Sequence, residues 1–408
     1  MRLLLFEDEY TRRLNPLVHL RPVYDLIFGI RTIREKYQNI FEEEFETLHC
    51  REELAAVMMA QNPKAEINSY SADKYVLING RSIITESVLQ SIDDSEDALY
   101  LKDGVIAAAV LSGSNIDQLR VVKGKLLSRK DFPDLPEKEI ECTWINYPWN
   151  LFLENGKEII REFEGPGIHG KVHNGVNMLN DENIYIAEGA VIKPGVMLDA
   201  EEGPIIIDVD AHIMANAYLQ GPLYVGKNSI IKAGAKIYEG TTIGDFCKVG
   251  GEVEEAIFHS YSNKQHDGFL GHSYLAMWVN LGAGTNNSDL KNNYGNVKFY
   301  VEGESLDTGT MFCGLIMGDH SKSGISAMFN TGTHVGISSN LYGSGFPPKF
   351  VPSFSWGGAE EMTTHQIDKA VATARLVMAR RDVEMSSEEE ALLKDVFEKT
   401  APERAAYD

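Results

Sequence analysis

The sequence lacks long apolar runs and contains few cysteines, and each absence excludes a class of protein. No apolar stretch approaches the roughly 20 residues that a helix needs to span a bilayer. The opening residues, MRLLLFEDEY, hold one short apolar run before acidic residues intervene, which favours a first β-strand over a secretory signal. The four cysteines, at positions 50, 142, 247 and 313, stand too far apart for a disulfide framework or a zinc knuckle. We therefore expect reduced thiols, no transmembrane helix and a cytoplasmic protein.

Basic residues are also scarce. Lys and Arg number 38 against 60 Asp and Glu, so the formal net charge is −22. Such a charge repels phosphate backbones and anionic headgroups, and we expect neither nucleic acid nor membrane as a partner. An anionic substrate would instead need cations gathered locally. At 408 residues the chain is long enough for two or three domains with cores of their own.

Bulky aliphatic residues recur at every sixth position in the middle of the chain. They are Ile207, Ile213, Leu219, Val225, Ile231, Ile237, Ile243 and Val249. A period of six fits neither an α-helix nor a flat strand, and it indicates a solenoid whose stacked turns bury one apolar column. Three six-residue edges close a triangular coil, so the pattern predicts a left-handed parallel β-helix. The register continues through Phe269, Leu275 and Leu281 and again from Met311, and we expect loops at 252–268 and 286–297.

The flanking regions have different patterns. Residues 1–165 alternate aliphatic strand-like runs with helical stretches, which is the pattern of an α/β domain. Residues 166–345 form the predicted β-helix. Residues 346–408 begin with a loop rich in Gly and Pro and continue with helical spacing, so we expect one or two helices that cap the end of the solenoid.

Two segments in the β-helix resemble a known family. SNKQHDGFLG at 262–271 and WVNLGAGT at 278–285 are similar to motifs of the bifunctional N-acetylglucosamine-1-phosphate uridylyltransferase/glucosamine-1-phosphate N-acetyltransferase family. There, a Ser-Lys-x-x-His segment precedes Leu-Gly, and Asn-Ile-Gly-Ala-Gly-Thr follows at a fixed distance. The resemblance implies that His266 is the catalytic base, that Asn280 helps to form the site and that Ala283 contacts acetyl-CoA.

Other positions of the motif match less closely. Lys232 lies where the family carries an Arg for the sugar phosphate, and Lys keeps the charge but loses the bidentate fork. Phe269 replaces a Tyr, so a hydroxyl contact is lost. The family's Asn-Tyr pair corresponds either to Asn293 and Tyr294 or to the pair at 289–290. No clear cation stands at 254–255, where a second phosphate-binding Lys is expected.

The implied chemistry suits these residue types. An amino sugar is largely ammonium near neutral pH, and only the free amine attacks a thioester, so a histidine with a pKa of about 6.5 is a suitable base. A backbone N–H in the Gly-Ala-Gly stretch could stabilise the oxyanion. The resemblance thus implies acetyl-CoA as cosubstrate and an amino-sugar phosphate as acceptor, with glucosamine 1-phosphate the leading candidate. It also implies a homotrimer, because in the family both substrates lie between neighbouring subunits.

The N-terminal region is similar to a divergent branch of sugar nucleotidyltransferases, through LRPVYDLIFGIRTIREK at 20–36 and YVLINGRSI at 75–83. The glycine-rich phosphate loop that ordinary members carry after the first strand is absent. Arg12, Arg13 and Arg21 are the cations that could bind the phosphates of UTP or dTTP. The pair Asn79 and Gly80 lies where a metal-binding Asp is expected. Nucleotidyl transfer in this domain would require Mg²⁺.

Three alternatives remain open. The chain could be a sugar-1-phosphate nucleotidyltransferase whose β-helix serves only assembly, or a non-catalytic trimeric binding protein. A zinc site would make it similar to carbonic anhydrases with this prism, but the spacing of its histidines does not match their close pair. The candidate histidines are His259, His266, His272, His320 and His334. We therefore predict no metal site in the prism.

Overall fold

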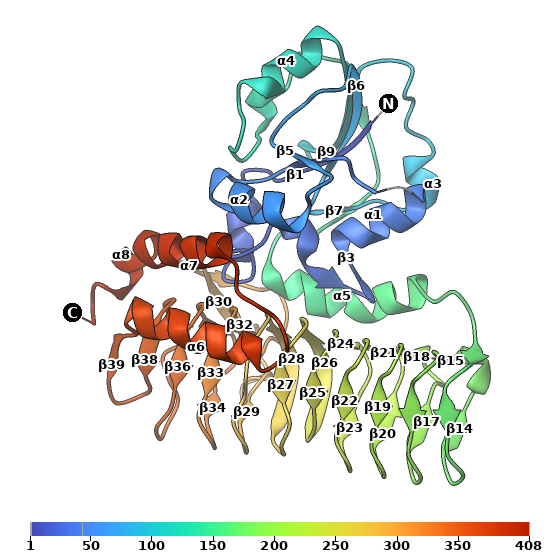
Figure 1. Ribbon diagram of the computed structural model, residues 1–408, viewed down its shortest axis with the longest axis vertical. Coiled ribbons are helices and arrows are strands. Elements are labelled where there is room, and N and C mark those ends of the chain that lie inside the picture. The colour runs from blue at the N-terminus through green and yellow to red at the C-terminus, as the bar shows by residue number, and fades with distance from the viewer. Residues whose placement is uncertain (1, 43, 408) are drawn as a thin grey trace.

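The computed structural model describes residues 2–42 and 44–407, in which an α/β domain sits on a long prism of parallel strands (Figure 1). The α/β domain holds a seven-stranded sheet of order β10-β8-β9-β6-β1-β4-β5. In this sheet β1 pairs in parallel with β4 and β6, whereas β9 runs antiparallel to β6 and β8. Its strands are β1 (Arg2–Phe6), β4 (Thr47–His49), β5 (Glu66–Ile67), β6 (Lys74–Asn79), β8 (Ala98–Lys102), β9 (Val105–Ser112) and β10 (Glu137–Glu139).

Helices and two short strand pairs complete the α/β domain. The short strands are β2 (Ile27–Phe28), β3 (Arg31–Thr32), β7 (Ser82–Ile83) and β11 (Thr143–Trp144), and the helices are α1 (Ile33–Phe41), α2 (Glu52–Gln61), α3 (Glu86–Leu89), α4 (Ser114–Arg120) and α5 (Pro148–Arg161). The Thr32 hydroxyl accepts from the Glu35 N–H, and the Glu35 carboxylate accepts from the Thr32 N–H, so a capping box fixes where α1 begins. No helix in the described part of the chain is long and apolar enough to cross a membrane.

The prism is a parallel β-helix with three walls, which we call A, B and C. The chain passes from B to C to A in each coil. Wall A contains β14 (Asn177–Leu179), β17 (Met197–Asp199), β20 (Tyr218–Gln220), β23 (Lys236–Ile237), β29 (Asn286–Asn287) and β34 (Met328–Phe329). Wall B contains β12 (Gly167–Ile168), β15 (Ile184–Ile186), β18 (Ile205–Ile207), β21 (Leu223–Val225), β24 (Thr241–Ile243), β32 (Leu315–Met317), β35 (Thr333–Val335) and β37 (Phe350–Val351). Wall C contains β13 (Lys171–Val172), β16 (Val191–Ile192), β19 (His212–Ile213), β22 (Ile230–Ile231), β25 (Lys248–Val249), β27 (Asn263–Lys264), β33 (Lys322–Ser323), β36 (Asn340–Leu341) and β38 (Ser355–Gly357).

The sixth-position register is confirmed in the clean part of the repeat. Every predicted aliphatic from Ile207 to Val249 is fully buried in the column between the walls. Downstream, Leu275 and Leu281 are buried in the same column, as predicted, but two other positions differ. Leu270 is buried and takes the inward position in place of the half-exposed Phe269, and Met311 is 44% exposed, so neither Phe269 nor Met311 is the inward residue we expected.

The predicted interruptions have different outcomes. The segment 252–268 is not a loop, because β26 (Glu252–Phe258) runs from wall A to wall B with one bend at Glu255, whose φ is 46°. The next long strand, β28 (Phe269–Leu275), repeats this path. An interruption does follow the predicted start at 286, but Asn286 and Asn287 form β29 of wall A, and the insertion extends past 297 through the hairpin of β30 (Lys298–Val301) and β31 (Glu304–Asp307).

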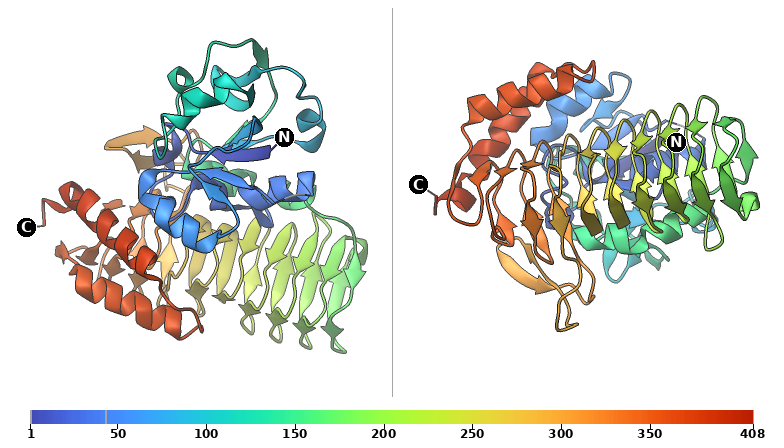
Figure 2. Two further views of the ribbon diagram at one scale, coloured as in Figure 1. Left: turned by 45° about the horizontal axis from the view of Figure 1, so that its top comes forward. Right: turned by 90° about the horizontal axis from the view of Figure 1, so that it is seen from below.

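Helices cover the end of the prism. These are α6 (Ile367–Ala379), α7 (Ser387–Lys399) and α8 (Ala401–Arg404), and the strand β39 (Met362–Thr364) pairs with β38 before them. Figure 2 shows the coils side by side, with α6 and α7 beside the last of them. Strands of walls B and C therefore continue past residue 345, where we expected the β-helix to end.

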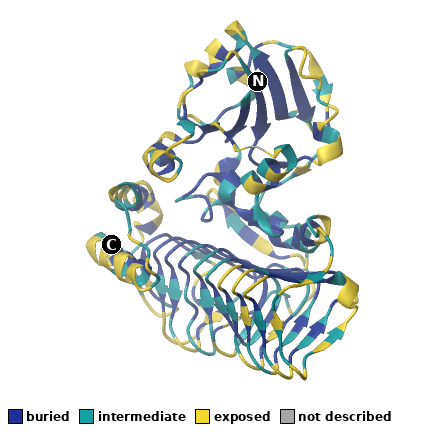
Figure 3. Ribbon diagram, turned by 45° about the vertical axis from the view of Figure 1, so that its right-hand side comes forward, coloured by how far each residue is buried: buried dark blue, intermediate teal, exposed yellow. Residues whose placement is uncertain are grey.

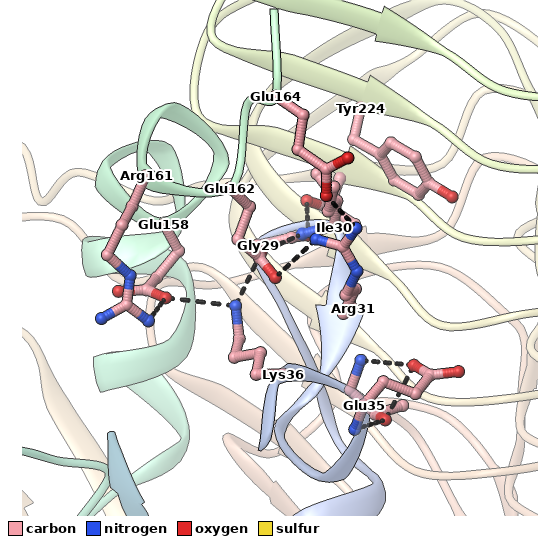
Figure 4. Close-up of polar contacts among 12 residues, drawn as sticks. Gly29, Ile30, Arg31, Glu35, Lys36, Glu158, Arg161, Glu162, Glu164 and Tyr224 are labelled. Atoms are coloured by element: carbon pink, nitrogen blue, oxygen red, sulfur yellow. Dashed lines mark hydrogen bonds and ion pairs between the residues drawn. The ribbon is translucent and has the colours of Figure 1, made fainter. Parts of the chain in front are cut away.

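The α/β domain is fixed to wall B by buried polar contacts. Asn155 on α5 accepts a hydrogen bond from the Gly29 N–H at 2.8 Å and donates to the Gly240 carbonyl, also at 2.8 Å. Within the α/β domain, Figure 4 shows Lys36 of α1 beside Glu158 and Glu162 of the α5 end that packs on this wall, and the Nζ–O distances are 3.1 and 2.6 Å. In Figure 3 the strands of the α/β sheet are buried, whereas exposed residues collect along the far corner of the prism. The two parts thus form one continuous body.

Candidate functional site

The corner between walls C and A brings three predicted site residues together. Successive coils are joined there by hydrogen bonds from the Leu281 N–H to the Asn263 carbonyl at 2.8 Å and from the Gly284 N–H to the Asp267 carbonyl at 3.0 Å. This register places Ala283 directly beside His266, one coil further on. Asn280 forms a β-bridge with Asn263 on wall C, a short distance before the same corner. His266, Asn280 and Ala283 therefore share one surface of the prism.

The corner of His266 is held by a buried lysine that the sequence analysis missed. Lys264 pairs with Val249 in wall C and is 1% exposed, so it occupies an inward position where neighbouring coils carry aliphatics. Its Nζ donates to the carbonyls of Gly250 at 2.9 Å, His266 at 3.1 Å and Gly268. Burial lowers the pKa of Lys264 to about 8. The sequence signal was a lysine two positions before His266, but it lies 15 positions after Val249, which is not a multiple of six, so the repeat did not mark it as inward.

If the corner catalyses the acetyl transfer that the resemblance implies, Lys264→Met should lower kcat by roughly tenfold to a hundredfold with little change in KM, because the corner would lose the contact that holds the His266 backbone. The substitution also changes the pH dependence of stability. Since the folded-state pKa of Lys264 is about 8 against an ordinary 10.5, the unfolded chain binds more protons between these values. Lys264 therefore adds a contribution to the free energy of unfolding that grows with pH across that window, and denaturation at several pH values should show the difference between wild type and variant changing by that contribution.

Lys171→Met is the matched control, because Lys171 is an exposed lysine on the same wall. It should leave both kcat and the alkaline stability profile unchanged. If Lys264→Met keeps full kcat, the buried ammonium has no part in positioning the histidine.

The other predicted residues of the prism are more scattered. Lys232 lies on wall C two coils before Gln265, because Ile231 pairs with Val249 and Val249 with Lys264. Phe269 begins wall A, and its N–H donates to the Asn286 side chain at 2.8 Å. Asn293 and Tyr294 are exposed in the insertion between walls A and B, at a different corner from His266. Within a single chain, Asn293 and Tyr294 therefore do not lie near His266.

The carboxyl ends of strands in the α/β domain form a second candidate site. There the Asp8 carboxylate accepts two hydrogen bonds from the Arg81 guanidinium, each at 2.6 Å, and one from the Asn79 side chain at 2.9 Å. The Asn79 carboxamide also donates to the Ile106 carbonyl at 3.0 Å, and Gly80 packs against the Tyr24 ring. Asp8, Asn79 and Arg81 are thus already saturated with protein partners.

Arg81 is a residue that the sequence analysis did not single out, and it is fully buried. The motif Asn79-Gly80-Arg81 places it directly after the pair that lies where a metal-binding Asp is expected. In the ranges 2–42 and 44–407, no group of three or more His, Cys, Asp or Glu side chains could hold a metal ion. A magnesium ion would therefore depend on the phosphates it accompanies and on a single carboxylate such as the exposed Glu9.

The three predicted arginines have different surroundings. Arg12 is exposed, with Nη2 3.8 Å from the Glu53 carboxylate, and the Arg13 guanidinium lies 4.3 Å from the centre of the Tyr10 ring. Arg21 is buried against Asp319 of the prism, with Nη1 3.1 Å from Oδ2 and a second contact between Nη2 and Oδ1. Phosphate binding by these arginines stays a prediction. Arg12 and Arg13 are the two whose positions leave them accessible.

Cavities of contrasting character lie along the molecule. One of about 850 Å³ lies where the α/β domain meets wall B, and Figure 4 shows part of its lining at Arg31, Glu164 and Tyr224. Carboxylates outnumber cations in its lining, so it suits a phosphate poorly. A cavity of about 70 Å³ lies beside Asp8, Glu9 and Asn79. A third, of about 390 Å³, opens on wall C next to Gln265 and Asn280.

Comparison with known proteins supports the resemblance of the α/β domain to sugar nucleotidyltransferases and that of the chain to bifunctional relatives. Residues 3–166 match the family described as sugar nucleotidyl transferase. The chain is 32% identical over 203 residues to a bifunctional sugar-1-phosphate nucleotidylyltransferase/acetyltransferase of Sulfurisphaera tokodaii, which covers 47% of this chain and 49% of that protein. It is 31% identical over 116 residues to the bifunctional protein GlmU of Bartonella bacilliformis, which covers 27% of this chain and 26% of that protein. The alignments thus span about half and about a quarter of these curated relatives.

Solved structures with a likeness include UDP-N-acetylglucosamine acyltransferase from Campylobacter jejuni, at 11% identity and a TM-score of 0.23, covering 56% of this chain and 96% of that one. A second UDP-N-acetylglucosamine acyltransferase is 14% identical with a TM-score of 0.21, covering 59% and 84%. Scores this low add nothing to the strand pairing described above. The predicted resemblance and the predicted fold class are confirmed, and the relatives are transferases.

Proposed function

We propose that the chain is an acetyl-CoA-dependent N-acetyltransferase for an amino-sugar phosphate, with glucosamine 1-phosphate the leading acceptor. The observation that carries the proposal is the shared corner of walls C and A, where His266 lies beside Ala283 of the next coil and close to Asn280. The match to a relative named as a bifunctional nucleotidylyltransferase/acetyltransferase supports it.

The chain's own groups suffice for the chemistry. His266 is exposed, so an amine bound at this corner can pass its proton to the imidazole as the nitrogen attacks the thioester carbonyl. The N–H of Ala283 has no acceptor within the described residues and can donate to the oxyanion that forms. The carbon–sulfur bond then breaks, the amide remains on the sugar, and the thiolate of coenzyme A leaves and takes up a proton.

A trimer would complete the site. Asn293 and Tyr294 lie at the corner between walls A and B, away from the His266 of their own chain. Their predicted roles therefore require a neighbouring copy that presents its insertion to this corner. Homotrimers in which the site lies between subunits are what the sequence resemblance implies.

The match of residues 3–166 favours a second activity, sugar-1-phosphate nucleotidyl transfer with UTP or dTTP and Mg²⁺. Because the Arg81 guanidinium is bound to the Asp8 carboxylate, the accessible Arg12 and Arg13 are the phosphate ligands that we propose for it. An active first domain with an inactive prism is the alternative, in which the β-helix serves only assembly.

The two activities are separable by their products. Purified full-length chain is incubated with glucosamine 1-phosphate and acetyl-CoA while free thiol is followed, and separately with UTP or dTTP, Mg²⁺ and N-acetylglucosamine 1-phosphate while pyrophosphate is followed. Thiol release that depends on the amino sugar supports the proposal. Pyrophosphate release alone would favour the alternative, and neither product would favour a non-catalytic binding protein.

A further inference from the structure

The cavity on wall C gathers four cations from two distant parts of the chain. Lys248 and Lys322 belong to strands β25 and β33 of the wall, whereas Arg380 and Arg381 follow the C-terminal end of α6, which packs beside it. The cavity measures about 390 Å³. Pockets of this size commonly hold small-molecule ligands.

These four cations have no counter-charge. The lining contains neither Asp nor Glu, and no ion pair joins any of the four to a carboxylate anywhere in the part of the chain that the structure describes. Their polar contacts are instead to neutral groups, from Arg381 Nη2 to the Asn263 side chain at 2.9 Å and from Lys322 Nζ to the His320 carbonyl at 2.8 Å. This arrangement is unusual in a chain with a net charge of −22.

Burial, and for Lys248 also neighbouring charges, shifts the pKa values of the lysines in this cavity. Burial lowers the pKa of Lys322 to about 8. The pKa of Lys248 is also lowered, first by burial and then by its neighbours Arg381, Lys232 and Arg380. An anion that entered the cavity would relieve this repulsion, and it would form charge-assisted hydrogen bonds with groups that now lack a charged partner.

One rim of the cavity is aromatic. Trp278 stacks on Tyr261 with ring centres 4.2 Å apart and an interplanar angle of 17°, and Phe246 continues the stack at 4.9 Å. Tyr261 and Trp278 both line the cavity. Cations beside aromatic faces suit a phosphate ester, particularly one that also carries a flat base.

We infer that this cavity is a phosphate-ester binding site whose ligands are Lys248, Lys322, Arg380 and Arg381. Gln265 and Asn280 also line it, so it adjoins the corner that carries His266. The anion is a phosphate monoester, supplied either by the 3′-phosphoadenosine end of an acyl-coenzyme A or by the sugar phosphate. The choice between these two sources rests on the proposed acetyl transfer, but the presence of an anion site does not.

Isothermal titration of the full-length chain tests the inference with three probes: adenosine 3′,5′-bisphosphate, glucosamine 1-phosphate and inorganic phosphate. We expect at least one phosphate ester to bind, and we expect Arg380→Met/Arg381→Met to weaken it by roughly tenfold or more, because two charge-assisted contacts are lost. Lys369→Met is the control, since Lys369 is an exposed cation on the same helix, outside the cavity, and should leave binding unchanged. Stronger binding of the bisphosphate identifies the coenzyme, and stronger binding of the sugar phosphate identifies the acceptor.

The inference is overturned if no probe binds the wild type, or if the double variant, shown to be folded by an unchanged melting temperature, binds as tightly as the wild type. Lys248→Met/Lys322→Met provides a second variant pair should the arginine variant fail to fold. If the wild-type chain binds a phosphate ester through these arginines but transfers no acetyl group, the proposed function is contradicted and the anion site remains supported. If the chain transfers acetyl groups but binds the phosphate esters equally well without Arg380 and Arg381, the anion site is overturned and the proposed function stands.

Discussion

Replacing His266 by alanine is expected to reduce acetyl transfer by about 10²–10⁴-fold, the usual contribution of a positioned general base. The side chain is exposed and has no hydrogen-bond partner among the described residues, so its loss should leave the fold intact. Thiol release measured with saturating glucosamine 1-phosphate and acetyl-CoA, together with the melting temperature, checks both parts of the expectation.

His212→Ala is the matched control, because His212 is an exposed histidine on wall C in an earlier coil. It should keep wild-type activity. A His266→Ala chain that releases thiol at a near wild-type rate would remove the base from the mechanism. The acetyltransferase assignment would then have to rest on another group.

Replacing Arg21 by methionine is expected to destabilise the chain by about 3–5 kcal/mol, because it leaves the Asp319 carboxylate buried without its charged partner. Asp319 is 1% exposed, and its only other side-chain contact in the described residues is with the Met277 N–H at 3.2 Å. The free energy of unfolding by urea measures the effect. Since Arg21 joins the α/β domain to the prism, we expect both parts to unfold at lower denaturant.

Two variants make this test specific. Arg12→Met removes an exposed arginine and should change stability by less than about 0.5 kcal/mol. Arg21→Met/Asp319→Leu removes both buried charges and should recover much of the lost stability. If Arg21→Met is as stable as the wild type but loses pyrophosphate release, Arg21 acts on the nucleotide, as the sequence first suggested.

The prism was predictable because its repeat is local. Each inward aliphatic from Ile207 to Val249 is six positions from the next, and neighbouring coils bury one another, so the periodicity alone identifies both the walls and the core. Motif spacing likewise placed His266, Asn280 and Ala283 together, since residues a coil apart in sequence become neighbours in space.

The partners of Arg21 and Asp8 were not predictable by these means. Arg21 meets a carboxylate 298 positions away, and the Asp8 pair with Arg81 spans 73 positions. Neither pair is linked by a sequence repeat or by a motif of fixed spacing. A lone arginine near a nucleotidyltransferase motif favours phosphate binding from sequence, but burial against a distant acid gives it a structural partner. The cavity on wall C escaped notice for the same reason, because its lysines lie on strands β25 and β33 and its arginines follow helix α6, far away in the sequence.

The most direct test of the acetyltransferase assignment is to follow a labelled acetyl group. Full-length chain is incubated with isotope-labelled acetyl-CoA and glucosamine 1-phosphate, and the sugar is recovered for mass spectrometry. We predict labelled N-acetylglucosamine 1-phosphate in amounts equal to the free thiol released, and a rate of labelling about 10²–10⁴-fold lower with His266→Ala. Unlabelled sugar after prolonged incubation at saturating substrate, with the wild type folded and trimeric, would contradict the assignment.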